Sequence, residues 1–143
     1  GKEDSPGNSS RGVIQLEDVS VLLVDDESDF VNTLTKRMNK RQLKTSSVNS
    51  GEDALEFLDR HPMDVVILDV KMPSMGGIQT LREIKKQHPL VEVIMLTGHA
   101  DMEVAIQGME IGAFDYLMKP MAIDDLVYKI QDAYKKKSIQ EKE

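Results

Sequence analysis

Acidic residues, one threonine and one lysine stand at the ends of apolar segments in this chain, where their side chains could do chemistry. Asp25 and Asp26 follow the first apolar segment, and Asp69 follows a later one. Thr97 and Lys119 come at the ends of two further segments. Three carboxylates brought close together repel one another, so a site that holds them needs a cation or a proton.

The residue types at these positions suit the binding and transfer of a phosphoryl group. Oxygen ligands without His or Cys are typical of a hard cation such as Mg²⁺. A carboxylate can attack phosphorus and form an aspartyl phosphate, and phosphoryl transfer depends mainly on positioning and charge neutralisation. Lys119 would bind a phosphoryl oxygen as a point charge, and the Thr97 hydroxyl would donate a hydrogen bond to another. The glycine-rich patterns GxxxxGK[ST] and GxGxxG are both absent from the sequence, so a phosphate loop of those types is not expected.

Five short apolar segments alternate with helical patterns and position these residues. The segments are 19–24, 43–48, 63–68, 91–96 and 114–117. Most are rich in Val or Ile and almost continuously apolar, which is typical of parallel strands buried on both faces. Apolar stripes at helical spacing follow each segment: Phe30, Leu34 and Met38; Ala54, Leu55 and Leu58; Ile78, Leu81 and Ile84; Met102, Ala105, Ile106 and Met109; Leu126, Val127, Ile130 and Tyr134.

This alternation of strand and helix predicts a doubly wound α/β fold with a parallel sheet and helices on both faces. Ser50, with Asp53 three residues later, is a candidate cap for the helix that begins there. Folds of this class bind ligands outside the carboxyl ends of their strands. We therefore expect the acids, Thr97 and Lys119 to meet at one edge of the sheet.

Composition limits the classes of protein that this chain can belong to. It has 143 residues, with 18 basic and 25 acidic side chains and a net charge of −7, which argues against a general nucleic-acid surface. It has no Cys, so disulfides, zinc–thiolate sites and cysteine nucleophiles are excluded. No apolar run approaches the roughly 18 residues of a membrane span. We expect a cytoplasmic protein with no membrane association.

The polar composition of both ends gives the expected domain boundaries. Residues 1–16 are interpreted as a disordered leader, 17–137 as one domain, and 138–143 as a C-terminal tail or the start of a linker. The three lysines 135–137 are interpreted as the C-terminus of a helix, where the helix dipole favours cations.

The set of strand-end residues resembles that of two-component response-regulator receiver domains, over about residues 17–137. Each motif alone is common, but their order, each at the end of its own apolar segment, is specific. The matching residues are Asp25-Asp26, Asp69 with Met72-Pro73 and Gly76-Gly77, Thr97-Gly98, Tyr116 and Lys119-Pro120. The resemblance implies a flavodoxin-like (βα)5 fold, as in chemotaxis regulators, with strand order 2-1-3-4-5.

The resemblance also implies roles for the residues of the site. Asp69 would accept a phosphoryl group from a histidine kinase or a phosphotransfer protein. Asp26 and Asp69, with the backbone carbonyl of Lys71, would bind Mg²⁺ directly, and Asp25 would act on the metal through water. Lys119 would pair with the phosphoryl group. The domain would be a signalling switch and not an enzyme, apart from its own phosphorylation and dephosphorylation.

Further residues are implied in switching. Thr97 would move toward the phosphoryl group and Tyr116 would change rotamer, which would reshape the face formed by the fourth helix, fifth strand and fifth helix. That face would control an output domain or partner protein, with a homodimer also open. Lys71 and His99 would influence the phosphoryl lifetime. The peptide bond before Pro120 would be cis, an isomer confined almost entirely to proline.

Two alternative functions remain open from the residues alone. A phosphohydrolase of the haloacid-dehalogenase type also uses a strand-end Asp, a Thr, a Lys and Mg²⁺. Those enzymes carry a second Asp two residues after the nucleophile, and that position is Lys71 here. The other alternative is a pseudo-receiver that binds a protein partner and never takes phosphate. The interpretation as a receiver domain does not identify the kinase, the pathway or the output domain. Transcriptional regulation is one context that fits it.

Overall fold

A computed structural model of the chain describes residues 15–72 and 75–142. The expected leader lies outside the described residues except for its last two positions, and so does Pro73 of the resemblance motif. Leu16 begins a short 3-10 turn, Leu16–Asp18, and packs against the hydrophobic core.

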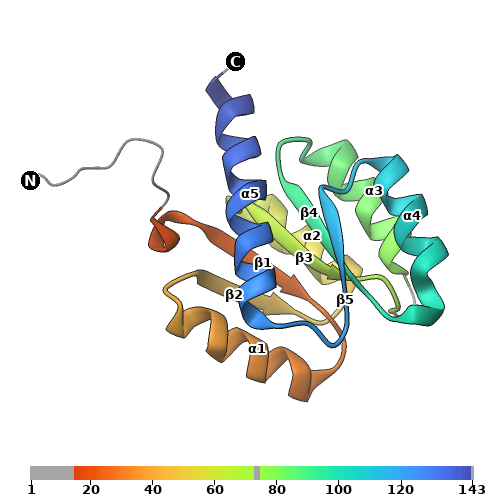
Figure 1. Cartoon of the computed structure of the whole chain (residues 1–143). Helices are drawn as coiled ribbons and strands as arrows, with labels where there is room; N and C mark the ends of the chain where they lie inside the picture. The colour runs from red at the N-terminus through yellow and green to blue at the C-terminus, as the bar shows by residue number, and fades with distance from the viewer. Residues whose placement is uncertain (1–14, 73–74, 143) are drawn as a thin grey trace, which may run out of the picture.

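Five parallel strands form one sheet in the order β2-β1-β3-β4-β5 (Figure 1), so the predicted fold class and strand order are confirmed. Each strand lies within two residues of its predicted segment: β1 (Ser20–Val24), β2 (Lys44–Val48), β3 (Val65–Asp69), β4 (Glu92–Thr97) and β5 (Asp115–Met118). The helices between and after them are α1 (Ser28–Lys40), α2 (Gly51–Arg60), α3 (Gly77–Gln87), α4 (Met102–Ile111) and α5 (Ile123–Lys142).

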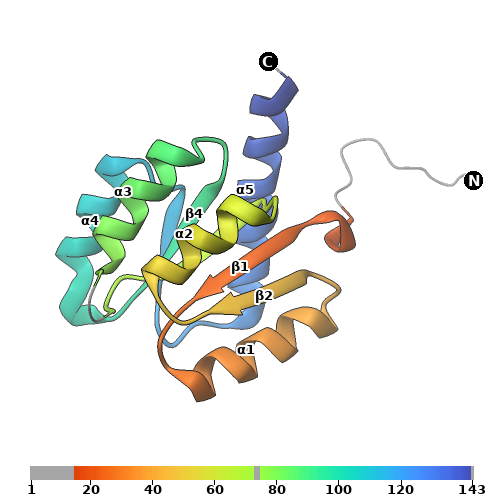
Figure 2. The same cartoon turned by 180° about the vertical axis from the view of Figure 1, so that it is seen from behind.

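The helices cover the two faces of the sheet unequally. Helices α1 and α5 pack on one face and α2, α3 and α4 on the other, as the two opposite views show (Figures 1 and 2). Alternate residues of each strand enter the two cores, so that Leu23 and Ile67 face α1 and α5, while Leu22 and Leu68 face the other three helices. Burial on both faces explains why the strand segments read as almost continuously apolar.

The predicted apolar stripe of α4 is wrong in part. Ile106 and Met109 are 54% and 38% exposed, whereas Ala105 and Gly108 are buried against the sheet. A Cβ atom at Gly108 would lie 2.3 Å from the sulfur of Met95, so the small residues allow α4 to approach β4 closely. Because α4 is apolar around much of its circumference, spacing alone did not identify its buried face.

The capping prediction for α2 is confirmed, since the Ser50 hydroxyl accepts a hydrogen bond from the backbone N–H of Asp53 at 3.0 Å. The last helix, however, continues to Lys142 and so includes residues 138–142 of the segment expected as a tail. The lysines 135–137 therefore do not mark its C-terminus. Within 15–72 and 75–142, no helix has both the length and the apolar character needed to cross a membrane.

Candidate functional site

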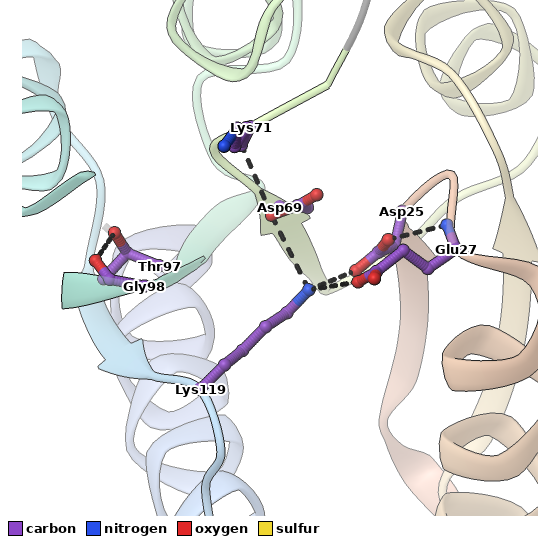
Figure 3. A network of polar contacts seen from close by, with 7 residues as sticks. All are labelled: Asp25, Glu27, Asp69, Lys71, Thr97, Gly98 and Lys119. Atoms are coloured by element: carbon purple, nitrogen blue, oxygen red, sulfur yellow. Dashed lines mark hydrogen bonds and ion pairs between the residues drawn. The ribbon is translucent and has the colours of Figure 1, made fainter. Parts of the chain in front are cut away.

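The carboxyl ends of β1, β3, β4 and β5 bring the predicted residues to one edge of the sheet. Figure 3 shows Asp25, Asp69 and Thr97 on neighbouring strand ends, with the Lys119 side chain reaching across from the end of β5. A cleft of about 670 Å³ opens here. Its lining residues are Asp26, Glu27, Asp69, Lys71, Met72, Gly98, Asp101 and Lys119.

Three carboxylates of this edge are close enough to bind one cation. Asp25, Asp26 and Asp69 each offer an oxygen, and these atoms all lie within 4.8 Å of one another. Asp25 and Asp69 are buried, while Asp26 is exposed. A set of oxygen ligands that is partly buried and open to solvent on one side fits Mg²⁺, which keeps several of its waters.

The environment of Asp69 disfavours its charged form. The pKa of its carboxyl is raised from 3.8 to about 6, first by burial and then by the negative charge of Asp25. The ammonium of Lys119 and the hydrogen bond from the Lys71 backbone N–H, 3.3 Å long, act in the opposite direction. The crowding of carboxylates predicted from the sequence is therefore present at Asp69, and a cation in the cleft would relieve it.

Lys119 is the cation that these carboxylates share in the described structure of the cleft. Its Nζ lies 2.9 Å from Asp25 Oδ2, 3.1 Å from Glu27 Oε1 and 3.7 Å from Asp69 Oδ1. Burial acts to lower the pKa of the amine, but the hydrogen bond to Asp25 and the surrounding carboxylates outweigh it and raise the pKa. Lys119 is therefore a protonated point charge, held closer to β1 than to β3.

Short backbone contacts hold the remaining site groups in place. The Glu27 backbone N–H donates to Asp25 Oδ1 at 2.9 Å, which orients the buried carboxylate. Thr97 is fully buried, and its hydroxyl donates to the Gly98 carbonyl at 3.1 Å, away from the Lys119 contacts (Figure 3). The peptide bond between Lys119 and Pro120 is cis, the isomer that the resemblance implied.

The other predicted residues lie farther from these contacts. Tyr116 is half-buried on β5 and packs against the core beneath α4. His99 is exposed in a 3-10 turn (His99–Asp101) and is not among the residues that line the cleft. Lys71 is exposed and does line it.

Two residues near Lys119 had no role in the sequence interpretation. Glu27, which directly follows the Asp25-Asp26 pair in the sequence, pairs with Lys119. Phe30 was assigned to a core stripe, but Lys119 Nζ lies 4.3 Å from the centroid of its ring. A third acid directly after the acid pair was the available signal for Glu27. Nothing in the spacing indicates that the Phe30 ring faces the lysine.

The comparison with known proteins adds to this geometry. The family model of the response regulator receiver domain matches residues 21–131. The chain belongs to this family. Receiver domains are switches of two-component signal transduction, so the predicted class of protein is confirmed, and the phosphohydrolase alternative is set aside.

Relatives and solved structures agree with the assignment. The chain is 37% identical to the regulatory protein AtoC of Escherichia coli over 83% of its length, and 37% identical to the DNA-binding transcriptional regulator NtrC of Klebsiella pneumoniae over 73%. It spans only 26% and 22% of those two proteins. A receiver domain protein from Clostridium thermocellum superposes with a TM-score of 0.82 at 37% identity, covering 85% of this chain and 98% of that one.

Proposed function

We propose that Asp69 accepts a phosphoryl group from a phosphohistidine of a histidine kinase or phosphotransfer protein. The observation that carries this proposal is the buried Asp69 carboxylate at the floor of an open acidic cleft, 3.7 Å from the ammonium of Lys119. Lys119 can reach an oxygen bound to Asp69 from there. An acid merely capping a strand would need neither the cleft nor the shared cation.

The reaction forms one bond and breaks one. An oxygen of the Asp69 carboxylate attacks phosphorus, the bond between phosphorus and the donor imidazole nitrogen breaks, and the nitrogen keeps the electron pair. The product is an acyl phosphate on Asp69 and, because the other ring nitrogen of the phosphohistidine carries a proton, a neutral imidazole on the donor. Hydrolysis later adds water at phosphorus, releases inorganic phosphate and returns the carboxylate. The carboxylate must be ionised to attack, so a pKa of about 6 still leaves most of Asp69 reactive at pH 7.

Asp25, Asp26 and Asp69 would hold a Mg²⁺ ion, together with the backbone carbonyl of Lys71. A bound Mg²⁺ would neutralise negative charge on the crowded carboxylates and on the phosphoryl oxygens. In this assignment Asp25 contributes through water, because its buried carboxylate is already engaged by Lys119 and the Glu27 backbone. Lys119 and the Thr97 hydroxyl bind the phosphoryl oxygens.

The switch follows from contacts that exist only after phosphorylation. Thr97 must leave the Gly98 carbonyl to reach the phosphoryl group. Tyr116 is proposed to change rotamer in the same transition. A state with those contacts is favoured by the phosphoryl group, which shifts the population toward an altered face of α4, β5 and α5. Lys71 and His99 are proposed to influence the phosphoryl lifetime, Lys71 from the cleft wall.

The proposed partners of this face are an output domain, a separate protein or a second copy of the chain. We propose that the domain lies in the cytoplasm, with no membrane or nucleic-acid contact of its own. The relative NtrC, which is named as a DNA-binding transcriptional regulator, makes control of transcription the preferred context.

The test is labelling with acetyl phosphate and Mg²⁺, read by intact mass and by mapping the modified residue. Wild type should gain one phosphoryl group on Asp69, and Asp69→Ala should gain none. Circular dichroism of the variant checks that it is folded. Absence of labelling in folded wild type would favour the pseudo-receiver alternative, and labelling of Asp69→Ala would refute the site assignment.

A further inference from the structure

Three groups that hold Lys119 come from one short segment, the connection from β1 into α1. Asp25 Oδ2 and Glu27 Oε1 lie 2.9 and 3.1 Å from its Nζ, and the Phe30 ring centroid lies 4.3 Å away. We propose that Glu27 and Phe30 are positioning residues that hold the Lys119 ammonium toward β1 in the unphosphorylated protein. They thereby set how readily this amine turns to the phosphoryl group on Asp69, an inference that rests on the proposed function.

The distances show the bias of the lysine. Nζ is nearer to both β1-side carboxylates than to Asp69, which lies at 3.7 Å (Figure 3). A phosphoryl oxygen added to Asp69 competes with Glu27 and Asp25 for the same ammonium. Asp25 is a candidate ligand of the metal, and a bound metal ion would neutralise the negative charge of Asp25. Glu27 has no such second role, so its carboxylate opposes the transfer of Lys119 toward Asp69.

Glu27 is held where it can act on Lys119. Its backbone N–H donates to Asp25 Oδ1 at 2.9 Å, so the buried carboxylate fixes the backbone from which the Glu27 side chain extends. The Glu27 side chain is 65% exposed and lines the cleft. It adds a negative charge at the mouth through which a dianionic phosphodonor must enter, an effect that works in the same direction as its pairing with Lys119.

Phe30 supplies the third contact without adding a charge. It is half-buried in the first turn of α1, and a ring face below an ammonium attracts it weakly. An exposed ion pair and one cation–π contact each contribute little free energy. Together they bias the position of the Lys119 ammonium but do not fix it. We therefore expect changes of a few fold, and not loss of phosphorylation.

The experiment compares Glu27→Gln with Asp29→Asn, which removes the same charge two residues later. Asp29 is exposed in the same first turn and does not line the cleft. With Mg²⁺, Glu27→Gln should bind beryllofluoride about two- to five-fold more tightly than wild type and react with acetyl phosphate faster by a similar factor. Asp29→Asn should stay close to wild type, and Phe30→Leu should show a smaller gain.

A spectroscopic readout separates positioning from a general effect on the fold. The ¹H–¹⁵N signal of the Lys119 ammonium should shift and exchange faster with water in Glu27→Gln, and Glu27→Asp should restore it in part. Equal values for Glu27→Gln and Asp29→Asn, or an unchanged Lys119 signal, would overturn the inference while Asp69 is still labelled. Failure of wild type to be labelled on Asp69 would instead overturn the proposed function, and the Lys119 signal would still report the contact.

Discussion

Both ends of the parallel sheet hold buried carboxylates, but lysines offset their negative charge more fully at the amino end than at the carboxyl end. At the carboxyl end, Asp25, Asp26 and Asp69 crowd together, and the ammonium of Lys119 pairs with Asp25 and Asp69. At the amino end, a partly buried acid just before β3 and a buried acid at the start of β4 are matched by lysines of α3 and α5. Those residues are Asp64, Glu92, Lys85, Lys136 and Lys137.

Ion pairs at the amino end tie helices to the sheet. The Glu92 side chain is 1% exposed, and its oxygens lie 3.9 Å from Lys85 Nζ and 3.4 Å from Lys136 Nζ. Asp64 accepts a hydrogen bond from the Ser20 backbone N–H at 2.8 Å, and Lys137 Nζ lies 3.2 Å from its other oxygen. The acids of this end are thus balanced by cations from the same chain.

This difference in charge between the two ends shows which end needs a cation from solution. The acids of the amino end are offset by lysines of the same chain, so this cluster calls for no further ion. The carboxyl end has more negative charge than Lys119 can offset, and the pKa of Asp69 is raised to about 6, first by burial and then by the charge of Asp25. Burial of an acid alone does not mark a site, but burial without enough counter-charge does.

The largest expected contrast is in phosphoryl labelling. Asp26→Asn removes a candidate metal ligand at the carboxyl end and should slow Mg²⁺-dependent labelling by acetyl phosphate at least about ten-fold. Asp64→Asn neutralises an acid at the amino end and should keep the rate within about two-fold. Initial rates by mass spectrometry at several Mg²⁺ concentrations measure both. Equal losses in the two variants would mean that the ends do not differ as described.

A smaller contrast is expected in stability. Without Mg²⁺, Asp69→Asn should raise the free energy of unfolding at pH 7 by about 1–3 kcal/mol, because it removes a charge that the folded state disfavours. The folded pKa of about 6 lies above the ordinary 3.8, so the cost of ionised Asp69 is absent below pH 3.8, grows between pH 3.8 and 6, and is constant above.

Urea unfolding of wild type and Asp69→Asn at pH 4, 5, 6 and 7 measures this difference. The difference in the free energy of unfolding between Asp69→Asn and wild type should shrink toward zero at pH 4. At pH 7, Mg²⁺ should reduce this difference by stabilising wild type alone. A gain that is independent of pH would show that the repulsion described for Asp69 is not the cause.

The smallest effect is expected at the amino end, with the opposite sign. Glu92→Gln should lower the free energy of unfolding by about 1–2 kcal/mol, because it leaves the partly buried Lys85 without its counter-charge. Labelling of Asp69 should be unaffected. The double variant Glu92→Gln with Lys85→Met is the matched control and should recover part of the loss. A stabilised single variant would mean that burial of Glu92 costs more than its ion pairs return.

The sequence predicted the carboxyl end of the sheet well, for a physical reason. Strand ends are marked by the change from apolar to polar residues, and parallel topology brings those ends together. Asp25, Asp69, Thr97 and Lys119 could therefore be assigned to one edge before any coordinates. Which face of α4 is buried could not be predicted, because a helix that is apolar around much of its circumference offers little contrast between its faces.

The amino end of the sheet was missed because its contacts do not follow a strand-end rule. In the sequence, Glu92 interrupts an apolar segment. The residues around Glu92 do not indicate that Lys136, more than forty residues later, lies against it. Lys136 and Lys137 were interpreted through the dipole of their own helix, yet they contact acids of the sheet. Contacts of side chains with distant partners depend on packing, which the pattern of a single segment does not contain.

The pairing of Asp25 with Lys119 also bears on the order in which the chain assembles. The two residues are 94 positions apart, and Asp25 is fully buried in the finished structure. Strand β1 lies between β2 and β3, and both of these strands precede Lys119 in the chain. Until Lys119 has been synthesised, the Asp25 carboxylate lacks the ammonium that pairs with it in the folded protein. The carboxyl edge of the sheet therefore cannot be completed before β5 is in place, and α5, which follows Lys119, must still complete the core on its face of the sheet.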